Sequence, residues 1–122
     1  MPTIENPDTG LFATAPAILG GAIQFSPPTG EANQQWLIPD LVGVTSIQSA
    51  GPGPFAWVPG AAVAGANVVT NLAAFNWFIT PVAGGGNTIR TNNAAALFWG
   101  APVAGEGVPL VPAANAAQFI FA

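Results

Sequence analysis

The tripeptides Trp36-Leu37-Ile38, Trp77-Phe78-Ile79 and Gln118-Phe119-Ile120 share one pattern, in which an aromatic or amide residue is followed by a large apolar residue and by Ile. Their first residues lie 41 positions apart, from 36 to 77 and from 77 to 118. A segment that recurs at a fixed period is one supersecondary unit, which cannot bury its apolar face alone. The three units must share one core, so the sequence predicts pseudo-threefold symmetry.

A second pattern opens each unit. An Ile is followed eight residues later by a large apolar residue, in the pairs Ile4 and Phe12, Ile47 and Phe55, and Ile89 and Leu97. We therefore expect a single domain over residues 1–122, made of the repeats 1–41, 42–83 and 84–122. Three such repeats leave no room for a further domain in 122 residues.

Turn residues divide each repeat into short segments. Pro, Gly and Asn recur every eight to twelve residues, which is typical of an all-β chain, and no window keeps a helical period without Pro or Gly. Only residues 113–117 could form one helical turn. Four strands in each repeat and twelve in all describe a β-trefoil, which is a six-stranded barrel capped by three hairpins.

The chain carries very little charge. Apolar residues make up 51% of it and charged residues 5%, against about 25% in an ordinary soluble domain. Arg90 is the only base, and the net charge is −4. One cation excludes phosphate-tracking contact with nucleic acid and docking on anionic lipid. A surface with so few charges favours association, so we expect a homo-oligomer or a larger assembly. The acids are Glu5, Asp8, Glu31, Asp40 and Glu106.

The usual catalytic side chains are missing. The sequence contains no His, Cys, Lys or Tyr, which removes most general bases and nucleophiles and any His- or Cys-ligated metal. We expect no enzymatic activity, no cofactor and no metal.

No segment resembles a targeting signal or a membrane anchor. Residues 1–6 lack the basic and apolar regions of a signal peptide. The apolar stretches 54–66 and 94–104 are broken by Pro and Gly and fall short of the ~20 residues that span a bilayer. We expect no membrane insertion, and a cytoplasmic location or export by an unconventional route.

Residues 3–38 carry a family resemblance. Ile4-Glu5-Asn6-x-x-Thr9-Gly10 and Asn33-Gln34-Gln35-Trp36-Leu37-Ile38 resemble the I-x-N-x-x-S/T-G and N-Q-x-W-x-I motifs of the ricin B-like lectins. Repeat two keeps only Trp77 and Ile79. Repeat three keeps Asn115 and Ile120, with Ala116 at the Gln position and Gln118 in place of Trp. The resemblance implies a β-trefoil lectin, and small lectins of this type without a signal peptide suggest a fungal source.

The resemblance also implies a sugar site in repeat one. Sites of this family combine a carboxylate, an aromatic ring that stacks on the sugar, and an Asn or Gln that binds hydroxyls. Phe25 matches the stacking ring and Asn33 the amide, while Thr14 stands where the family has Asp. Gln34 joins the candidate set, although the family's Gln at this position usually bonds the backbone. Repeat one therefore retains half of a sugar site.

The family's Asp position is occupied by Trp57 in repeat two and Trp99 in repeat three, each ten residues after the opening Ile. Exposed Trp is frequent at binding hot spots. We predict that both contact either a ligand or another copy of the chain.

Two functions of different classes fit these residues. The first is a lectin that binds neutral glycan weakly and needs multivalency to bind usefully. The alternative is a self-assembling structural or storage protein that kept the trefoil and lost the sugar. A third hypothesis is a protease inhibitor that presents one of the rigid loops 27–30 and 51–54 to a protease.

Overall fold

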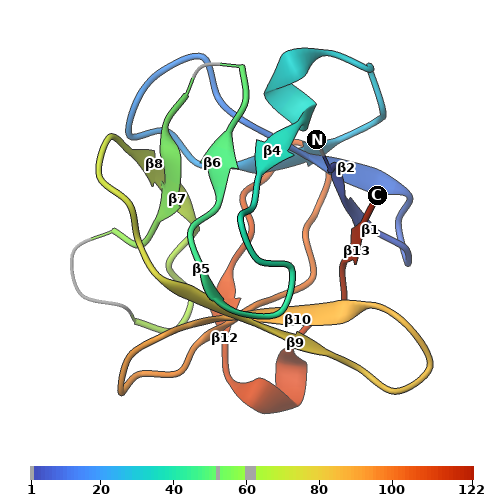
Figure 1. The fold of residues 1–122 in the computed structure, drawn as a ribbon, viewed down its shortest axis with the longest axis vertical. Coiled ribbons are helices and arrows are strands. Elements are labelled where there is room, and N and C mark those ends of the chain that lie inside the picture. The colour runs from blue at the N-terminus through green and yellow to red at the C-terminus, as the bar shows by residue number, and fades with distance from the viewer. Residues whose placement is uncertain (1, 52, 60–62) are drawn as a thin grey trace.

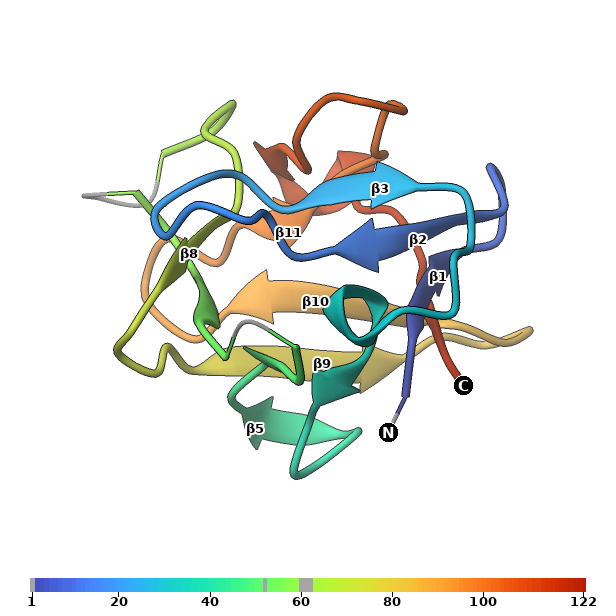
Figure 2. The same ribbon diagram turned by 90° about the horizontal axis from the view of Figure 1, so that it is seen from above.

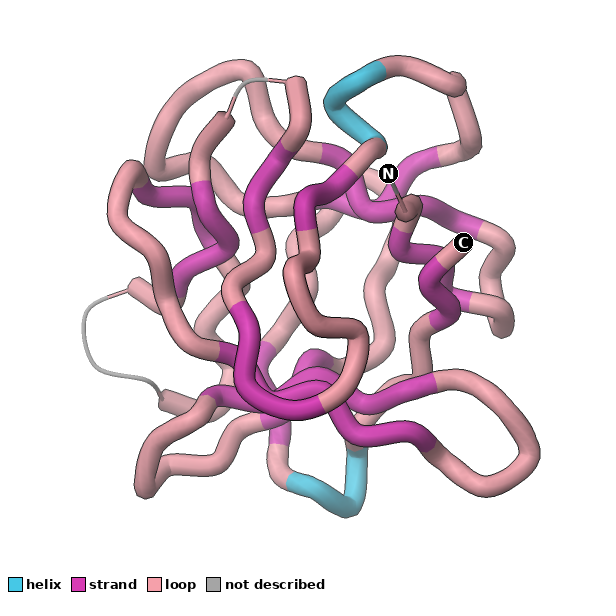
Figure 3. Tube along the Cα trace, in the orientation of Figure 1, coloured by secondary structure: helices cyan, strands magenta, loops and turns pink. Residues whose placement is uncertain are grey.

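The computed structural model describes residues 2–51, 53–59 and 63–122, which form short strands joined by loops (Figures 1 and 3). Two single 3-10 turns, Ala32–Gln34 and Ala113–Asn115, interrupt them. No helix in these ranges is long and apolar enough to cross a membrane. The strands are β1 (Ile4–Asn6), β2 (Leu11–Thr14), β3 (Gln24–Ser26), β4 (Trp36–Leu37), β5 (Gly43–Thr45), β6 (Gln48–Ser49), β7 (Phe55–Trp57), β8 (Val69–Asn71), β9 (Trp77–Pro81), β10 (Asn87–Thr91), β11 (Phe98–Trp99), β12 (Leu110–Val111) and β13 (Ile120–Phe121).

The strands form three antiparallel sheets with the orders β13-β1-β2-β3, β4-β6-β7-β8 and β12-β11-β10-β9-β5. The first strand of repeat two is divided into β5, which pairs with β9, and β6, which pairs with β4 and β7. Counting β5 and β6 as one strand gives the twelve strands that the repeats predict. The architecture is the expected β-trefoil.

The repeats meet at their third strands and at the chain ends. The backbone amide of Thr3 donates to the carbonyl of Ala122 at 2.8 Å, and the termini lie side by side (Figures 1 and 2). At the third strands, three isolated bridges close a triangle around the pseudo-threefold axis, each joining a different pair of repeats: Ala22 with Val69, Asn67 with Pro109, and Gly107 with Gln24.

The core contains the residues that recur. Ile4, Ile47 and Ile89 are fully buried, as the repeat pattern predicts, and so are Trp36 and Trp77. Trp77 continues into a chain of edge-to-face aromatic contacts, to Trp99 at 5.5 Å and from Trp99 to Phe119 at 5.7 Å between ring centroids.

Phe119, and not Gln118, takes the place of Trp36 and Trp77. Phe119 is fully buried, whereas Gln118 is exposed. The strand register agrees, because Ile120 pairs with Glu5 in the same way that Leu37 pairs with Gln48 and Phe78 with Arg90. The predicted equivalence of Gln118, and with it that of Asn115, is wrong by one residue.

The shift begins in the hairpin that opens repeat three. Arg90 pairs with Phe98, as Glu5 pairs with Phe12 and Gln48 with Phe55, so Phe98 and not Leu97 is the counterpart. Nine positions separate Ile89 from Phe98, against eight in the other repeats. This hairpin therefore holds one residue more than the other two.

Ala96 completes this longer hairpin with a φ of 46°. It lies two residues before Phe98, as Gly10 lies before Phe12 and Gly53 before Phe55, and both glycines also have positive φ (70° and 96°). Ala96 is the only non-glycine residue with positive φ in the described chain. An alanine therefore occupies a left-handed position that favours glycine.

The Asn-x-x-Thr-Gly motif of repeat one closes its hairpin. The side-chain oxygen of Asn6 accepts bonds from the Thr9 amide (3.2 Å) and hydroxyl (2.9 Å), and its carbonyl accepts from the Gly10 amide at 2.9 Å. In repeat three Thr91 stands at the position of Asn6, and its hydroxyl closes the turn differently, accepting from the Leu97 amide at 3.0 Å and donating to the Asn93 side-chain oxygen at 2.9 Å. The motif is thus a structural cap of the turn.

Candidate functional site

A pocket of about 270 Å³ lies in repeat one, where the chain leaves β2 and returns in β3. Thr14 and Gln24 pair across these strands, and they contribute its hydroxyl and amide groups. Gln24 is exposed and Thr14 is half-buried. The other lining residues are small or apolar: Ala15, Pro16, Ala17 and Ala22. This pocket lies beside the predicted sugar site and includes one of its four residues, Thr14.

Gln34 contacts the pocket residue Thr14 and is almost fully buried. Its side-chain nitrogen donates to the Thr14 hydroxyl at 3.1 Å and to the Pro27 carbonyl at 2.9 Å. Its oxygen accepts from the Thr29 amide at 2.8 Å. The whole amide is engaged within the protein, so Gln34 orients Thr14 and holds the loop that follows β3.

Asn33 does not line the pocket. Its carbonyl accepts a 2.8 Å bond from the amide of Ala15, which is a lining residue. Its side-chain oxygen is buried and has no hydrogen-bond partner among the described residues. Asn33 therefore supports the pocket wall through its backbone, and its ligand-binding role remains a prediction.

The structure contradicts the stacking role predicted for Phe25. Its ring has no exposed surface and packs against Phe119 at 5.6 Å between centroids. Successive side chains of a strand point to opposite faces, so Gln24 faces the pocket and Phe25 faces the core. The β3 residue that lines the pocket is Gln24, and strict alternation along the strand, with Ile23 and Phe25 both inward, would have indicated it.

Trp99 is also buried, with no exposed surface. Because of the longer third hairpin, it pairs with Leu110 on β12 as Ala13 pairs with Phe25 and Ala56 with Thr70. It therefore points inward, and the predicted contact with a ligand or another copy is wrong. The residue in register with Thr14 and Trp57 is Gly100.

Trp57 is half-buried. Its ring packs edge-on against Phe75 at 5.3 Å, and Phe75 in turn packs against Trp77 at 4.9 Å. Trp57 thus extends the aromatic core outward and keeps part of its surface accessible. Its contact with a ligand or a second copy remains a prediction.

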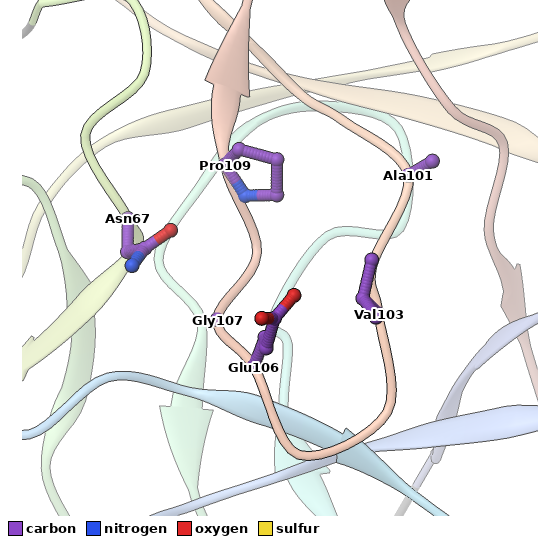
Figure 4. A pocket seen from close by; sticks show the side chains of 6 residues that line it. All are labelled: Asn67, Ala101, Val103, Glu106, Gly107 and Pro109. Carbon is purple, nitrogen blue, oxygen red and sulfur yellow. The ribbon is translucent and has the colours of Figure 1, made fainter.

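A second pocket, of about 390 Å³, lies in repeat three (Figure 4). Its walls are in register with those of the first pocket, because Ala101 corresponds to Ala15, Gly107 to Ala22, and Pro109 to Gln24. Its remaining lining residues are Asn67, Val103 and Glu106. The two pockets therefore occupy the same place in two repeats of the trefoil. The matching place in repeat two includes residues 60–62, which lie outside the described ranges.

The sequence pattern pointed to repeat one and missed the pocket of repeat three. A usable signal was the acid in Gly105-Glu106-Gly107, directly before the third strand of the repeat. Glu106 does not match the family's motif, because the resemblance implies a carboxylate at the opposite end of this loop.

Several solved structures share this fold. The designed three-fold symmetric protein ThreeFoil superposes with a TM-score of 0.82 at 15% identity, over 98% of this chain and 96% of that chain. The Rhizoctonia solani agglutinin gives 0.80 at 20% identity, over 98% and 92%. The ricin B-like lectin of Macrolepiota procera, in complex with lactose, gives 0.72 at 18% identity, over 99% and 85%.

These likenesses show that the chain has the fold of the ricin B-like trefoil lectins. At this level of identity they show the fold alone. No protein-family model and no curated protein matches the chain.

Proposed function

We propose that this protein is a non-catalytic carbohydrate-binding protein of the ricin B-like type, which binds neutral saccharide through weak, repeated sites. The observation that carries the proposal is the pair of pockets in matching places of repeats one and three. The trefoils with this fold support it, since one of them is a lectin in complex with lactose.

The lining residues suit weak binding. In repeat one, Thr14 and Gln24 offer a hydroxyl and an amide, and the other lining side chains are Ala and Pro. Neutral hydrogen bonds contribute less than charge-assisted ones, so the repeat-one site alone should bind weakly. Two sites on one chain, or many in an assembly, would raise the overall affinity through effective concentration.

The test is a titration of the 15N-labelled protein with a panel of neutral mono- and disaccharides, starting with lactose. We expect saturable amide shifts confined to residues 14–24, to residues 101–109, or to both. Shifts in neither segment, or small shifts spread evenly over the surface, would overturn the proposal. Trp fluorescence is a poor substitute here, because Trp36, Trp77 and Trp99 are fully buried.

The alternative, a self-assembling structural or storage protein, is favoured by the exposed aliphatic side chains. Ile18 is 77% exposed, Leu72 74% and Val42 60%, on a chain with only six charged residues. Light scattering over a range of concentrations tests it. We expect a large, concentration-dependent species that Ile18→Glu or Leu72→Glu reduces and that sugar leaves unchanged, with Glu31→Gln as the control.

A further inference from the structure

Glu106 is the only carboxylate that lines either pocket. It lies in the loop between β11 and β12, and its backbone amide donates to the Val103 carbonyl at 2.9 Å. Figure 4 shows its carboxylate between Asn67 on one side and Val103 and Ala101 on the other, below Pro109. The carboxylate therefore faces the pocket from a closed turn.

Asn67 comes from the neighbouring repeat, so the pocket is built from two repeats. It is held beside β12 by its bridge to Pro109 and by the 2.9 Å bond from the Val68 amide to the Val108 carbonyl. Gly107 makes room for its amide, because a Cβ at that position would lie 2.6 Å from the Asn67 side-chain carbon Cγ. The pocket thus combines a carboxylate and an amide on positions that backbone bonds hold in place.

We propose that this inter-repeat pocket binds a pair of neighbouring hydroxyls of a neutral saccharide, with Glu106 accepting their hydrogens and Asn67 completing the contacts. The inference rests on the proposed function and names the residues and ligand class of one of its sites. A carboxylate that accepts hydroxyl hydrogens makes the stronger, charge-assisted kind of bond. The site of repeat three should therefore bind more tightly than that of repeat one.

The carboxylate stands at a different place from the one that the family resemblance implies. The implied place, after the opening hairpin, is Gly100 in this repeat. A Cβ there would lie 2.7 Å from a methyl group of Val111 and 3.1 Å from the Pro109 carbonyl oxygen. A side chain at that place would force Val111 to shift, whereas Glu106 reaches the pocket from the opposite end of the loop.

The remaining walls define the ligand further. The other walls are aliphatic, being formed by Ala101, Val103 and Pro109. They can contact the C–H groups of a sugar, but they provide no aromatic ring for stacking. Glu106, on a chain of net charge −4, repels carboxylated and sulfated sugars. The pocket should therefore prefer neutral sugars to uronic acids of the same ring configuration.

The same 15N titration tests this inference with the wild type, Glu106→Gln and the matched control Glu31→Gln, whose glutamate is exposed in repeat one. We expect at least one neutral sugar to shift residues 101–109. Glu106→Gln should weaken that site by about tenfold or more, because a charge-assisted bond is lost, and should leave shifts at 14–24 unchanged. Glu31→Gln should match the wild type, and glucuronate should shift residues 101–109 less than glucose.

A second variant separates loss of a ligand contact from loss of fold. Gly107→Ala should displace Asn67 and weaken the same site, while the amide spectrum of the rest of the chain stays in place. Shifts at 14–24 alone would overturn this inference and leave the proposed function standing. The absence of shifts at residues 14–24 and at residues 101–109 would overturn both this inference and the proposed function. Full affinity in Glu106→Gln would also overturn the role of the carboxylate.

Discussion

The indole nitrogen of Trp36 donates a 3.1 Å hydrogen bond to the carbonyl oxygen of Ala13 inside the core. Trp77 makes the same 3.1 Å bond to Ala56 in repeat two. Each bond joins the last strand of a repeat to its second strand. In repeat three Phe119 stands in the place of the Trp, and Trp99 fills the interior from the second strand instead.

This difference predicts unequal costs for two chemically identical substitutions. Trp36→Phe and Trp99→Phe remove the same atoms from fully buried sites. Trp36→Phe also leaves the Ala13 carbonyl without its donor, whereas the Trp99 indole nitrogen has no partner among the described residues. The free energy of unfolding should fall by about 1–3 kcal/mol more for Trp36→Phe. Urea unfolding followed by circular dichroism measures both, and equal losses would show that the indole bond contributes nothing.

The repeat spacing was sufficient to predict the trefoil, because three recurring apolar units have few ways to share one core. Ile4, Ile47 and Ile89 are buried as the pattern requires. The spacing could not show that one extra residue lies in the third hairpin, since Leu97 and Phe98 are both large and apolar. Only the strand pairing of Arg90 with Phe98 reveals it.

The extra residue of the third hairpin should lower the stability of the protein through the backbone conformation of Ala96. Its left-handed backbone costs an L-residue about 1–2 kcal/mol, and glycine would relieve this at the expense of greater freedom in the unfolded chain. Ala96→Gly should therefore stabilise the protein by about 0.5–1 kcal/mol, measured by the same urea unfolding.

Gly10→Ala is the matched control for Ala96→Gly. A Cβ at Gly10 meets nothing within 4 Å, so only the backbone is affected, and the variant should lose roughly 1 kcal/mol. A destabilised Ala96→Gly variant would mean that the Ala96 methyl group makes contacts that outweigh the backbone strain.

The candidate site was less predictable than the fold. A motif assigns a residue type to a place, but a shift of one residue along a strand reverses which side chain faces outward. The predicted stacking role of Phe25 is wrong for this reason, and the predicted outward contact of Trp99 is wrong because the third hairpin is longer. The structural role that the resemblance implies for Gln34 agrees with its hydrogen bonds, since this role depends on the spacing to Trp36 within one short segment and not on alignment between repeats.

Gln34→Glu should destabilise the protein by about 2–3 kcal/mol. The new oxygen cannot donate to the Thr14 hydroxyl, and it would face the Pro27 carbonyl oxygen, which now accepts a 2.9 Å bond. Thermal unfolding at neutral pH measures the effect. Gln35→Glu is the control, because the neighbouring side chain is half-buried. Equal melting temperatures for the two variants would contradict the structural role of Gln34.

Thr14→Asp should restore to repeat one the charge that its pocket lacks. The substituted carboxylate would take over the 3.1 Å bond from the Gln34 side-chain nitrogen, which would orient it, and it would lie across the strand from Gln24. If repeat one binds sugar, its affinity should rise by about tenfold, since hydrogen bonds to a charged group are the stronger kind. The measurement is the dissociation constant from the shifts of residues 14–24. Thr14→Asn supplies a similar shape without the charge, so an equal gain in affinity in both variants would assign the effect to geometry. No gain in affinity in either variant would indicate that the repeat-one pocket does not bind sugar hydroxyls.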